Sequence, residues 1–282
     1  ERLLSTVGQR ERATQQRLIQ FFVEDLGYRH LSHRTGYTGN SNIDTNILSA
    51  WLKRRGVNDT LITRALRQLD SAAALGEGKK LYYANKEVYR LLRYGVKDKE
   101  GAGEQNQTVW LIDWANPQAN DFAIADEVTV KGEYCKRPDL VLYVNGIALG
   151  VIELKRSSVH ISEGIRQNLD NQKKTFIRDF FTTMQLVMAG NDTQGLRYGT
   201  IETPEKYYLE WKEDNPGDYT HKLDFHLSRL CSKSRLLDIV HNYIAFDVGV
   251  KKLCRHNQFF GVEAAKQHIA RREGGIIWHT QG

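Results

Sequence analysis

The first hundred residues carry apolar side chains at helical spacing, and polar residues or glycines mark the ends of the predicted helices. Apolar positions such as Leu18 and Phe22 recur every three or four residues, which is the period of an amphipathic helix. Gly27 predicts the end of the first helix, because glycine readily adopts the left-handed conformation of a C-cap. Asn58 or Asp59 is expected to cap the third helix. The pattern predicts helices over residues 10–27, 43–55, 58–70 and 86–94.

From about residue 108 the pattern changes to the shorter period of β-strands, with turn residues between the apolar runs. Besides a central pair described below, strands are predicted over residues 108–114, 122–130, 183–189, 196–201 and 275–278. Helices are predicted over residues 161–181, 232–245 and 257–272, and a polar loop over 203–222. This mixture predicts an α/β fold, in which helices flank a mixed sheet and a helical segment precedes it.

The central pair consists of two strands rich in Val, Leu and Ile that meet at Asn145-Gly146. Asp139 opens the first strand, while Glu153 and Lys155 close the second. Burying an unpaired carboxylate costs roughly several kcal/mol, so these acids need a partner, and a divalent cation is a natural one. A Pro-Asp pair followed after thirteen residues by Glu-x-Lys is the PD-(D/E)xK signature of metal-dependent nucleases.

Side chains alternate between the faces of a strand, so Glu153 and Lys155 are predicted to point the same way and Leu154 the other way. We expect Asp139 and Glu153 to bind Mg²⁺, with a backbone carbonyl near Leu154 completing the shell. Lys155 is expected to hold the attacking water or to stabilise the charge that develops on the phosphate. The alternative is an ordinary strand pair that ends in an exposed salt bridge.

The hairpin also makes a prediction about register. A strict two-residue turn at Asn145-Gly146 pairs Asp139 with Ile152 and puts its side chain on the wrong face for Glu153. An offset of one residue pairs Asp139 with Glu153 instead. We therefore predict a bulged or longer turn, or an Asp139 that lies just before regular pairing begins.

Composition and charge bear on the partner of the protein and on its cellular location. The 282 residues carry a net charge of +6, with a sequence pI of about 9.1, which suits a polyanionic partner and equally suits a mildly basic enzyme of another kind. The three cysteines are far apart and lack metal-ligand spacing, so we expect no disulfide framework or structural zinc, and a cytoplasmic location. No apolar run approaches the roughly 18 residues of a membrane span.

Four blocks of sequence, in this order, resemble the restriction (R) subunit of type I restriction–modification enzymes. They are residues 110–122, 137–155, 185–191 and 275–282. The resemblance covers residues 105–282 well and 1–100 loosely. It implies an endonuclease that needs Mg²⁺ and cuts double-stranded DNA, followed in a longer protein by an ATP-driven motor. It also implies modification (methyltransferase) and specificity subunits as partners.

The resemblance suggests further site residues. The family carries a Gln-x-x-x-Tyr pattern on the helix after the nuclease motif, and Gln167 falls on the glutamine position, with Asn171 in place of the tyrosine. Relatives often carry a glutamate on the first helix, where this chain has Gln15 and Gln16, so that acid is absent or elsewhere, for example Glu24. We expect Gln167 to act at the site, although a solvated helix residue explains it equally well.

Before the last predicted strand, the segment around Gln258 resembles the segment by which helicase-type motors read the adenine of ATP. The alternative for Gln258 is an ordinary helix N-terminus. Two basic clusters are candidates for contact with DNA, although a solvated helix face explains either one. These clusters are Lys53, Arg54 and Arg55, and Lys173, Lys174 and Arg178 around Phe176.

Together these observations predict three parts: a helical segment over residues 1–100, a nuclease core over 101–222, and a helical linker with the first motor strand over 223–282. The predicted function is that of the endonuclease region of a type I R subunit, coupled to translocation in the full protein. One alternative is a non-cleaving domain that binds DNA or docks a motor and has a degenerate nuclease site. A DNA-repair nuclease fused to a helicase is a further alternative.

Overall fold

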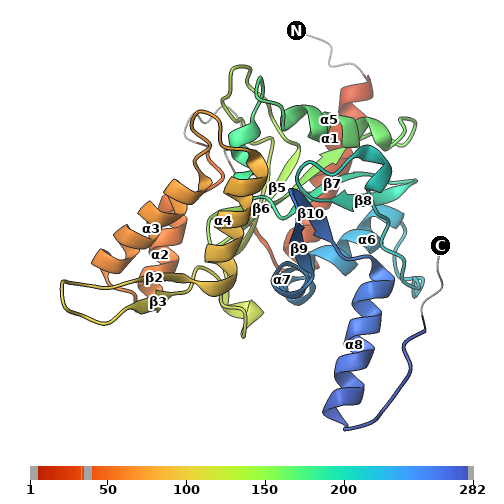
Figure 1. Ribbon diagram of the computed structural model, residues 1–282. Coiled ribbons are helices and arrows are strands. Elements are labelled where there is room, and N and C mark those ends of the chain that lie inside the picture. Colours follow the sequence, from red (N-terminus) through yellow and green to blue (C-terminus); the bar gives the residue numbers. More distant parts are fainter. Residues whose placement is uncertain (1–5, 33, 35–39, 279–282) are drawn as a thin grey trace.

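Six strands form the central sheet of the computed structural model, which describes residues 6–32, 34 and 40–278 (Figure 1). The strand order is β1-β4-β5-β6-β7-β8. Two neighbouring pairs, β1 with β4 and β6 with β7, are parallel, and the others are antiparallel. The strands are β1 (Arg29–Leu31), β4 (Phe122–Asp126), β5 (Leu140–Val144), β6 (Ile147–Leu154), β7 (Leu186–Asn191) and β8 (Gly195–Gly199).

Helices flank this sheet, and two small hairpins lie outside it (Figure 1). The helices are α1 (Thr6–Glu24), α2 (Thr45–Arg54), α3 (Asp59–Ala73), α4 (Leu81–Tyr94), α5 (Ser162–Asn171), α6 (Lys222–Cys231), α7 (Lys233–Asn242) and α8 (His256–Ala270). The hairpins are β2 (Val96–Asp98) with β3 (Gln107–Val109), and β9 (Ile244–Asp247) with β10 (Val250–Leu253). Short 3-10 helices are η1 (Pro117–Ala119), η2 (Arg178–Thr183) and η3 (Glu205–Tyr207). The predicted fold class, a mixed sheet with flanking helices and an N-terminal helix, is confirmed.

The N-terminal helices end and begin at the residues that the sequence marks. Gly27 follows α1 with a φ of 73°, the left-handed conformation expected of a C-cap glycine. Asn58 caps α3, because its side chain accepts a hydrogen bond of 2.9 Å from the backbone N–H of Leu61. The fourth helix begins at Leu81, earlier than residue 86.

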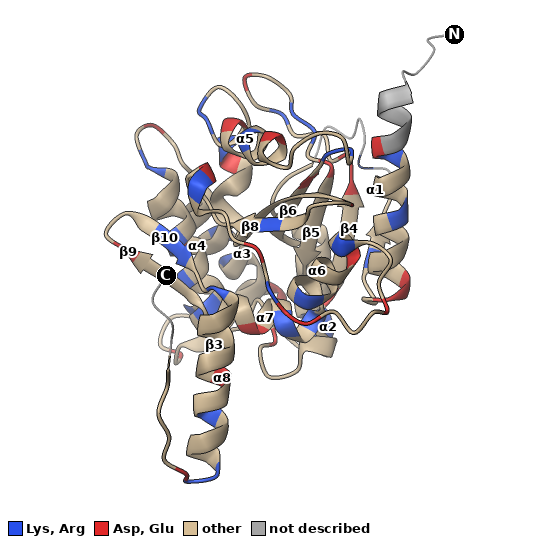
Figure 2. Cartoon of the chain, turned by 90° about the vertical axis from the view of Figure 1, so that its right-hand side faces the viewer, with Lys and Arg blue, Asp and Glu red and all other residues tan. Residues whose placement is uncertain are grey.

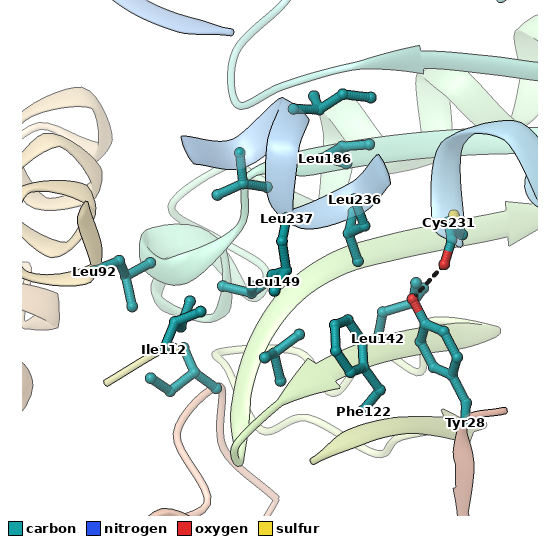
Figure 3. Close-up of a cluster of buried hydrophobic side chains, with 14 of the residues drawn as sticks. Tyr28, Leu92, Ile112, Phe122, Leu142, Leu149, Leu186, Cys231, Leu236 and Leu237 are labelled. Carbon is teal, nitrogen blue, oxygen red and sulfur yellow. Dashed lines mark hydrogen bonds between the residues drawn. The ribbon is translucent and has the colours of Figure 1, made fainter. Parts of the chain in front are cut away.

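Apolar side chains cover both faces of the sheet, which explains why β5 and β6 are apolar almost throughout. On one face, Leu142, Leu149 and Leu186 pack with side chains of α1, α6 and α7 (Figure 3). Tyr28 closes this core, and its hydroxyl donates a hydrogen bond of 2.7 Å to the carbonyl of Cys231. On the other face, Val141 and Val151 pack with side chains of η2. The active-site candidates lie at one end of this doubly buried pair of strands.

Several predicted elements differ from the structure. Only β3 forms within the predicted strand 108–114, because Asn120 holds the following loop by accepting from the N–H of Asp113 at 2.8 Å. The helix predicted over 161–181 ends at Asn171 and is followed by turns and η2. The structure adds elements that the periodicity did not predict, namely β1, α6 and the hairpin of β9 with β10.

The strand predicted over residues 275–278 is wrong. These residues are irregular, and they pair with no other described strand. Ile276 is 91% exposed and Trp278 86% exposed, so the apolar run that suggested a strand has no sheet to join. The remainder of the resembling segment, residues 279–282, lies outside the described residues.

The first hundred residues contribute directly to the central sheet. β1 is one of its two edge strands, and α1 lies along the sheet beside β4 (Figure 2). At the opposite end of the chain, α8 extends away from the sheet (Figure 1).

The division of the chain into three parts, residues 1–100, 101–222 and 223–282, stays a prediction. No helix among the described residues is long and apolar enough to cross a membrane.

Candidate active site

Strand β6 carries Glu153 into the interior at its C-terminal end. Glu153 is fully buried, and it is the one ionisable residue of this strand. The parallel neighbour β7 pairs Ala189 with Glu153, and the carbonyl of Gly190 accepts a hydrogen bond of 2.9 Å from the N–H of Lys155. The β7 side of the strand end is therefore fixed, which helps to set the direction of the Glu153 side chain.

Asp139 lies directly before β5 and faces the end of β6. Its carboxylate accepts a hydrogen bond of 2.7 Å from the N–H of Leu154. The pairing of Leu140 with Ile152 sets the register at this end of the hairpin, so Asp139 lies opposite Glu153. The predicted one-residue offset is thus confirmed, and so is the position of Asp139 before regular pairing begins.

The offset arises inside β6 rather than at the turn. Asn145 and Gly146 have φ values of 53° and 82°, which is a tight two-residue turn. The register shifts between Leu142 and Tyr143, so that β6 carries one extra residue, Leu149, at a bulge. A bulge is present, but the prediction that it lies at the turn is wrong. The turn stays tight because Asn145 donates to the carbonyl of Leu111 at 2.9 Å.

The two carboxyl groups change each other's ionisation. Burial raises the pKa of Asp139, and the N–H of Leu154 and the charge of Lys155 oppose that shift. Burial also raises the pKa of Glu153 well above its usual range, and the neighbouring Asp139 raises it further. Two like charges in a buried site repel strongly, so a proton or a cation between them is favoured.

Lys155 and Gln167 complete a connected group of side chains with Glu153. The Lys155 ammonium donates a hydrogen bond of 2.5 Å to the side-chain oxygen of Gln167. The amide nitrogen of Gln167 in turn donates to the Glu153 carboxylate at 2.8 Å. The structure therefore brings together all four residues predicted for the nuclease site: Asp139, Glu153, Lys155 and Gln167.

A glycine lets α5 approach the strands closely enough for these contacts. A Cβ atom added at Gly164 lies 3.0 Å from the Cβ of Ala189 and 3.5 Å from the Lys155 side chain. Contacts at 3.0 Å are too tight for a packed interior, so a larger residue pushes α5 outward. Gly164 thereby helps to set the distance between Gln167 and the end of β6.

Three further residues reach the site and were not predicted as part of it. Asn171 is buried, and its amide donates to the Glu153 carboxylate at 3.4 Å. Gln15 on α1 donates a hydrogen bond of 2.8 Å to the carbonyl of Asp139. The negative charge of Glu11 raises the pKa of Asp139, which places an acid of α1 near the site.

The helical period could have identified Glu11. It lies four residues before Gln15, so both side chains project from the same face of α1. Glu24 instead lies at the far end of α1, where it accepts a hydrogen bond from the exposed Gln20. Glu11 thus lies one helical turn before Gln15, in the region where the resemblance places a glutamate.

Gln258 lies apart from this group, at the start of α8. Its side-chain oxygen accepts a hydrogen bond of 2.8 Å from the N–H of Arg255, and its side chain is exposed. This contact caps the helix N-terminus, which agrees with the alternative interpretation of Gln258 as a residue of an ordinary helix N-terminus. Contact of Gln258 with ATP stays a prediction.

The donor atoms at the site suit a small, hard cation. Within the described residues, no cluster of three or more acidic, histidine or cysteine side chains forms a metal site. Mg²⁺ typically takes only one or two carboxylates from a protein and keeps water or substrate oxygens elsewhere. Asp139 and Glu153 meet that requirement, and the repulsion between them favours a cation.

Comparison with known proteins places the chain in a family. Residues 8–206 match the family model described as type I restriction enzyme R protein N terminus. The HindI type I restriction enzyme endonuclease subunit of Haemophilus influenzae is 26% identical over 253 residues, covering 81% of this chain and 24% of the relative. A Methanocaldococcus jannaschii protein, named for the MjaIXP type I restriction enzyme endonuclease subunit, is 25% identical over 304 residues, covering 92% of this chain and 29% of the relative.

The Staphylococcus saprophyticus SsaAORF53P type I restriction enzyme endonuclease subunit is 27% identical over 173 residues, 58% of this chain and 18% of the relative. This chain thus spans less than a third of the length of each of these relatives. The family model spans the sheet from β1 to β8 and includes Asp139, Glu153, Lys155 and Gln167. The chain belongs to the family of type I restriction enzyme R protein N-termini.

Proposed function

We propose that this chain hydrolyses DNA phosphodiester bonds with Mg²⁺ bound between Asp139 and Glu153. One observation carries the proposal: a bulge in β6 sets Asp139 opposite Glu153, and Lys155 lies at the end of the same strand. A structural salt bridge needs neither two adjacent buried carboxyl groups nor an amide network around them. When bound, Mg²⁺ polarises a phosphoryl oxygen and lowers the pKa of a water molecule.

The side chains of the site have separable roles in this proposal. Asp139 and Glu153 hold the cation, and the N–H of Leu154 keeps the Asp139 carboxylate in position. Lys155 stabilises the charge that develops on the phosphate or holds the water. Gln167 touches both Lys155 and Glu153, so it fixes the distance between the cationic and anionic groups.

The activity of the whole protein is part of the same proposal. The relatives are named as endonuclease subunits of type I restriction enzymes, and each is more than three times as long as the part that matches. We propose that cleavage of double-stranded DNA is coupled to ATP-driven translocation, in the cytoplasm, by a complex with modification and specificity subunits. ATP and Mg²⁺ are then the cofactors of the full protein.

The non-cleaving alternative rested on two departures from the family pattern, and the structure offers an explanation for each. Asn171, in place of the tyrosine, donates a hydrogen bond to Glu153. The first helix does carry an acid near the site, Glu11, one turn before the expected position. Neither departure therefore argues for a degenerate site.

Plasmid cleavage tests the proposal. The full-length protein is combined with its modification and specificity subunits, ATP and Mg²⁺, and wild type is compared with Lys155→Ala. We expect cleavage to fall by about 10²–10³-fold while ATP hydrolysis persists. Lys206→Ala, which removes an exposed lysine elsewhere, is the matched control. Cleavage at the wild-type rate by Lys155→Ala contradicts the proposal and favours a docking role.

A further inference from the structure

A basic groove of about 540 Å³ is lined in part by the residues that follow α5. Four parts of the chain line it: residues 40–42, the loop between α3 and α4 with Lys80, residues 130–133 and residues 174–180. Five cationic side chains line it, against the carboxylates of Glu133 and Asp179. The five are Lys79, Lys80, Lys131, Lys174 and Arg178.

Most of these cations are available to an external anion. Lys79 pairs with Glu87 at 2.6 Å, but none of the other four forms an ion pair with any described residue. The Nε atom of Arg178 is buried and has no hydrogen-bond partner among the described residues. A buried guanidinium nitrogen without a partner is costly, so an acceptor supplied by a ligand stabilises it.

The groove and the carboxylates are connected through Asn171, and Lys136 lies over one wall of the groove. Its ammonium lies 4.2 Å from the centre of the Phe176 ring, which lines the groove. The carbonyl of Asn171, whose side chain donates to Glu153, accepts a hydrogen bond of 3.1 Å from the N–H of Ile177, which also lines the groove. The chain also links the two places directly. Helix α5 ends at Asn171 beside Glu153, and three residues later Lys174 lines the groove.

Two of the segments that line the groove, residues 130–133 and 174–180, are held at a fixed spacing. A Cβ atom added at Gly132 lies only 2.0 Å from the carbonyl oxygen of Phe176, so only glycine allows this approach. The N–H of Tyr134 also donates to the carbonyl of Thr175. Lys131 and Lys174 therefore face the groove from two segments that cannot readily separate. Figure 2 shows Lys and Arg on the loops around α5.

We propose that this groove binds the sugar–phosphate backbone of duplex DNA beside the scissile phosphate, with Lys131, Lys174 and Arg178 as phosphate contacts. The proposal rests on the nuclease function proposed above and names where its substrate lies. A row of cations from three chain segments suits a polyanion, since each neutralised phosphate releases counterions. The continuity with Glu153 through Asn171 favours the substrate over an unrelated anion.

Fluorescence anisotropy with a labelled duplex of about 30 base pairs tests the groove, using this chain in a chelator at several salt concentrations. Lys131→Ala/Lys174→Ala removes two charges from the groove. Lys53→Ala/Arg54→Ala removes two charges from α2, which carries the other basic cluster. We expect the groove variant to bind about 10-fold more weakly, with a salt dependence shallower by about two phosphate contacts, and the α2 variant to bind as wild type.

Replacing the two lysines by arginine distinguishes the loss of charge from the loss of the fold. Lys131→Arg/Lys174→Arg keeps both charges, so it is expected to restore affinity and salt dependence. The groove assignment is overturned if Lys131→Ala/Lys174→Ala binds as wild type, or if the α2 variant loses as much affinity. It is also overturned if the arginine variant stays weak although its circular dichroism is that of wild type.

Glu153→Gln distinguishes this proposal from the nuclease function. It leaves every groove cation in place, so we expect its affinity for the duplex to match wild type while its cleavage in the full complex is lost. Cleavage by Glu153→Gln contradicts the nuclease assignment, whereas the anisotropy of the groove variants still decides where DNA binds.

Discussion

Glu153 and Lys251 are both deeply buried, and their surroundings differ. Lys251 on β10 is 3% exposed, and its ammonium donates to Asn85 at 2.7 Å, Gln185 at 2.6 Å and the carbonyl of Met184 at 3.2 Å. These three oxygens match the three N–H groups of an ammonium. Glu153 instead has an amide network on one side and a second carboxyl group, Asp139, beside it.

The difference separates a structural charge from a functional one. The rings of Tyr89 and Phe246 enclose Lys251, with centroids 5.7 and 5.2 Å from its ammonium, so the protein alone satisfies this group. Lys251 joins the hairpin of β9 and β10 to α4 and to the start of β7. The two acids differ from Lys251, because burial raises the pKa of both and the neighbouring Asp139 raises that of Glu153 further. Such a site favours a ligand that carries positive charge.

The largest expected effect is on cleavage by Glu153→Gln. The amide nearly matches the shape of a protonated carboxyl group but cannot contribute charge to a cation, so we expect a loss of about 10³-fold or more. The free energy of unfolding without metal is expected not to fall, because the amide replaces a buried carboxyl group whose ionisation is disfavoured by burial and by Asp139. Plasmid cleavage and urea unfolding measure the two quantities, and a fall in stability with cleavage intact reverses the assignment.

Lys251→Met is expected to give the opposite pattern. It leaves the oxygens of Asn85 and Gln185 buried without their donor, at a cost of about 2–4 kcal/mol in the free energy of unfolding. Cleavage per folded molecule is expected to remain. Lys252→Met is the control, since Lys252 is exposed on the same strand and pairs only with Asp247. Urea unfolding of the two variants checks the prediction, and equal stabilities contradict a structural role for Lys251.

Gln167→Ala tests the amide network around the acids. Removing a group that orients a metal ligand typically costs about 10–100-fold in metal affinity or activity, and we expect a loss in that range. Arg166→Ala, on the adjacent exposed position of α5, removes only a surface pair with Glu205 and is expected to be near wild type. Cleavage assays over a range of Mg²⁺ concentrations compare them. If the Mg²⁺ dependence of Gln167→Ala is unchanged, Gln167 does not contribute to metal binding or cleavage.

The smallest expected effect is a pH dependence of stability in the absence of metal. The pKa of Glu153 is raised in the folded state, so the folded state holds its proton above the pKa of about 4.3 of an unfolded glutamate. The stability contributed by this group is complete below that pH and is lost as the pH rises through the folded pKa. Glu153→Gln removes the effect, so its unfolding free energy relative to wild type is expected to rise between pH 5 and 8. A constant difference contradicts the raised pKa.

The apolar pattern was enough to predict the central hairpin and the face of Glu153 and Lys155. It also predicted that Asp139 needs a one-residue offset, because period-two alternation fixes which residues share a face. It could not locate the bulge at Leu149, since any position along the two strands gives the same offset at Asp139. The tight turn at Asn145 depends on a contact with Leu111, a residue far away in the sequence.

Long-range contacts also explain what the pattern missed. Glu11 reaches the site only because α1 packs along the sheet. In the sequence, Lys251 looks like a surface lysine beside Lys252, and only the contact of its strand with α4 buries it. The apolar residues 275–278 suggested a strand, but strands need a neighbour and none is present among the described residues. Local patterns thus predicted elements and site residues, while tertiary packing determined their partners.

The central claim is that Asp139 and Glu153 bind one divalent cation, and calorimetric titration of Mg²⁺ into this chain tests it most directly. Wild type and Glu153→Gln are titrated at the same pH, with the folded fraction of each checked by circular dichroism. The account predicts a single binding event with wild type that is at least about 10-fold weaker in the variant. Binding of the same heat and affinity in both proteins would show that the cation, if it acts here, is held elsewhere.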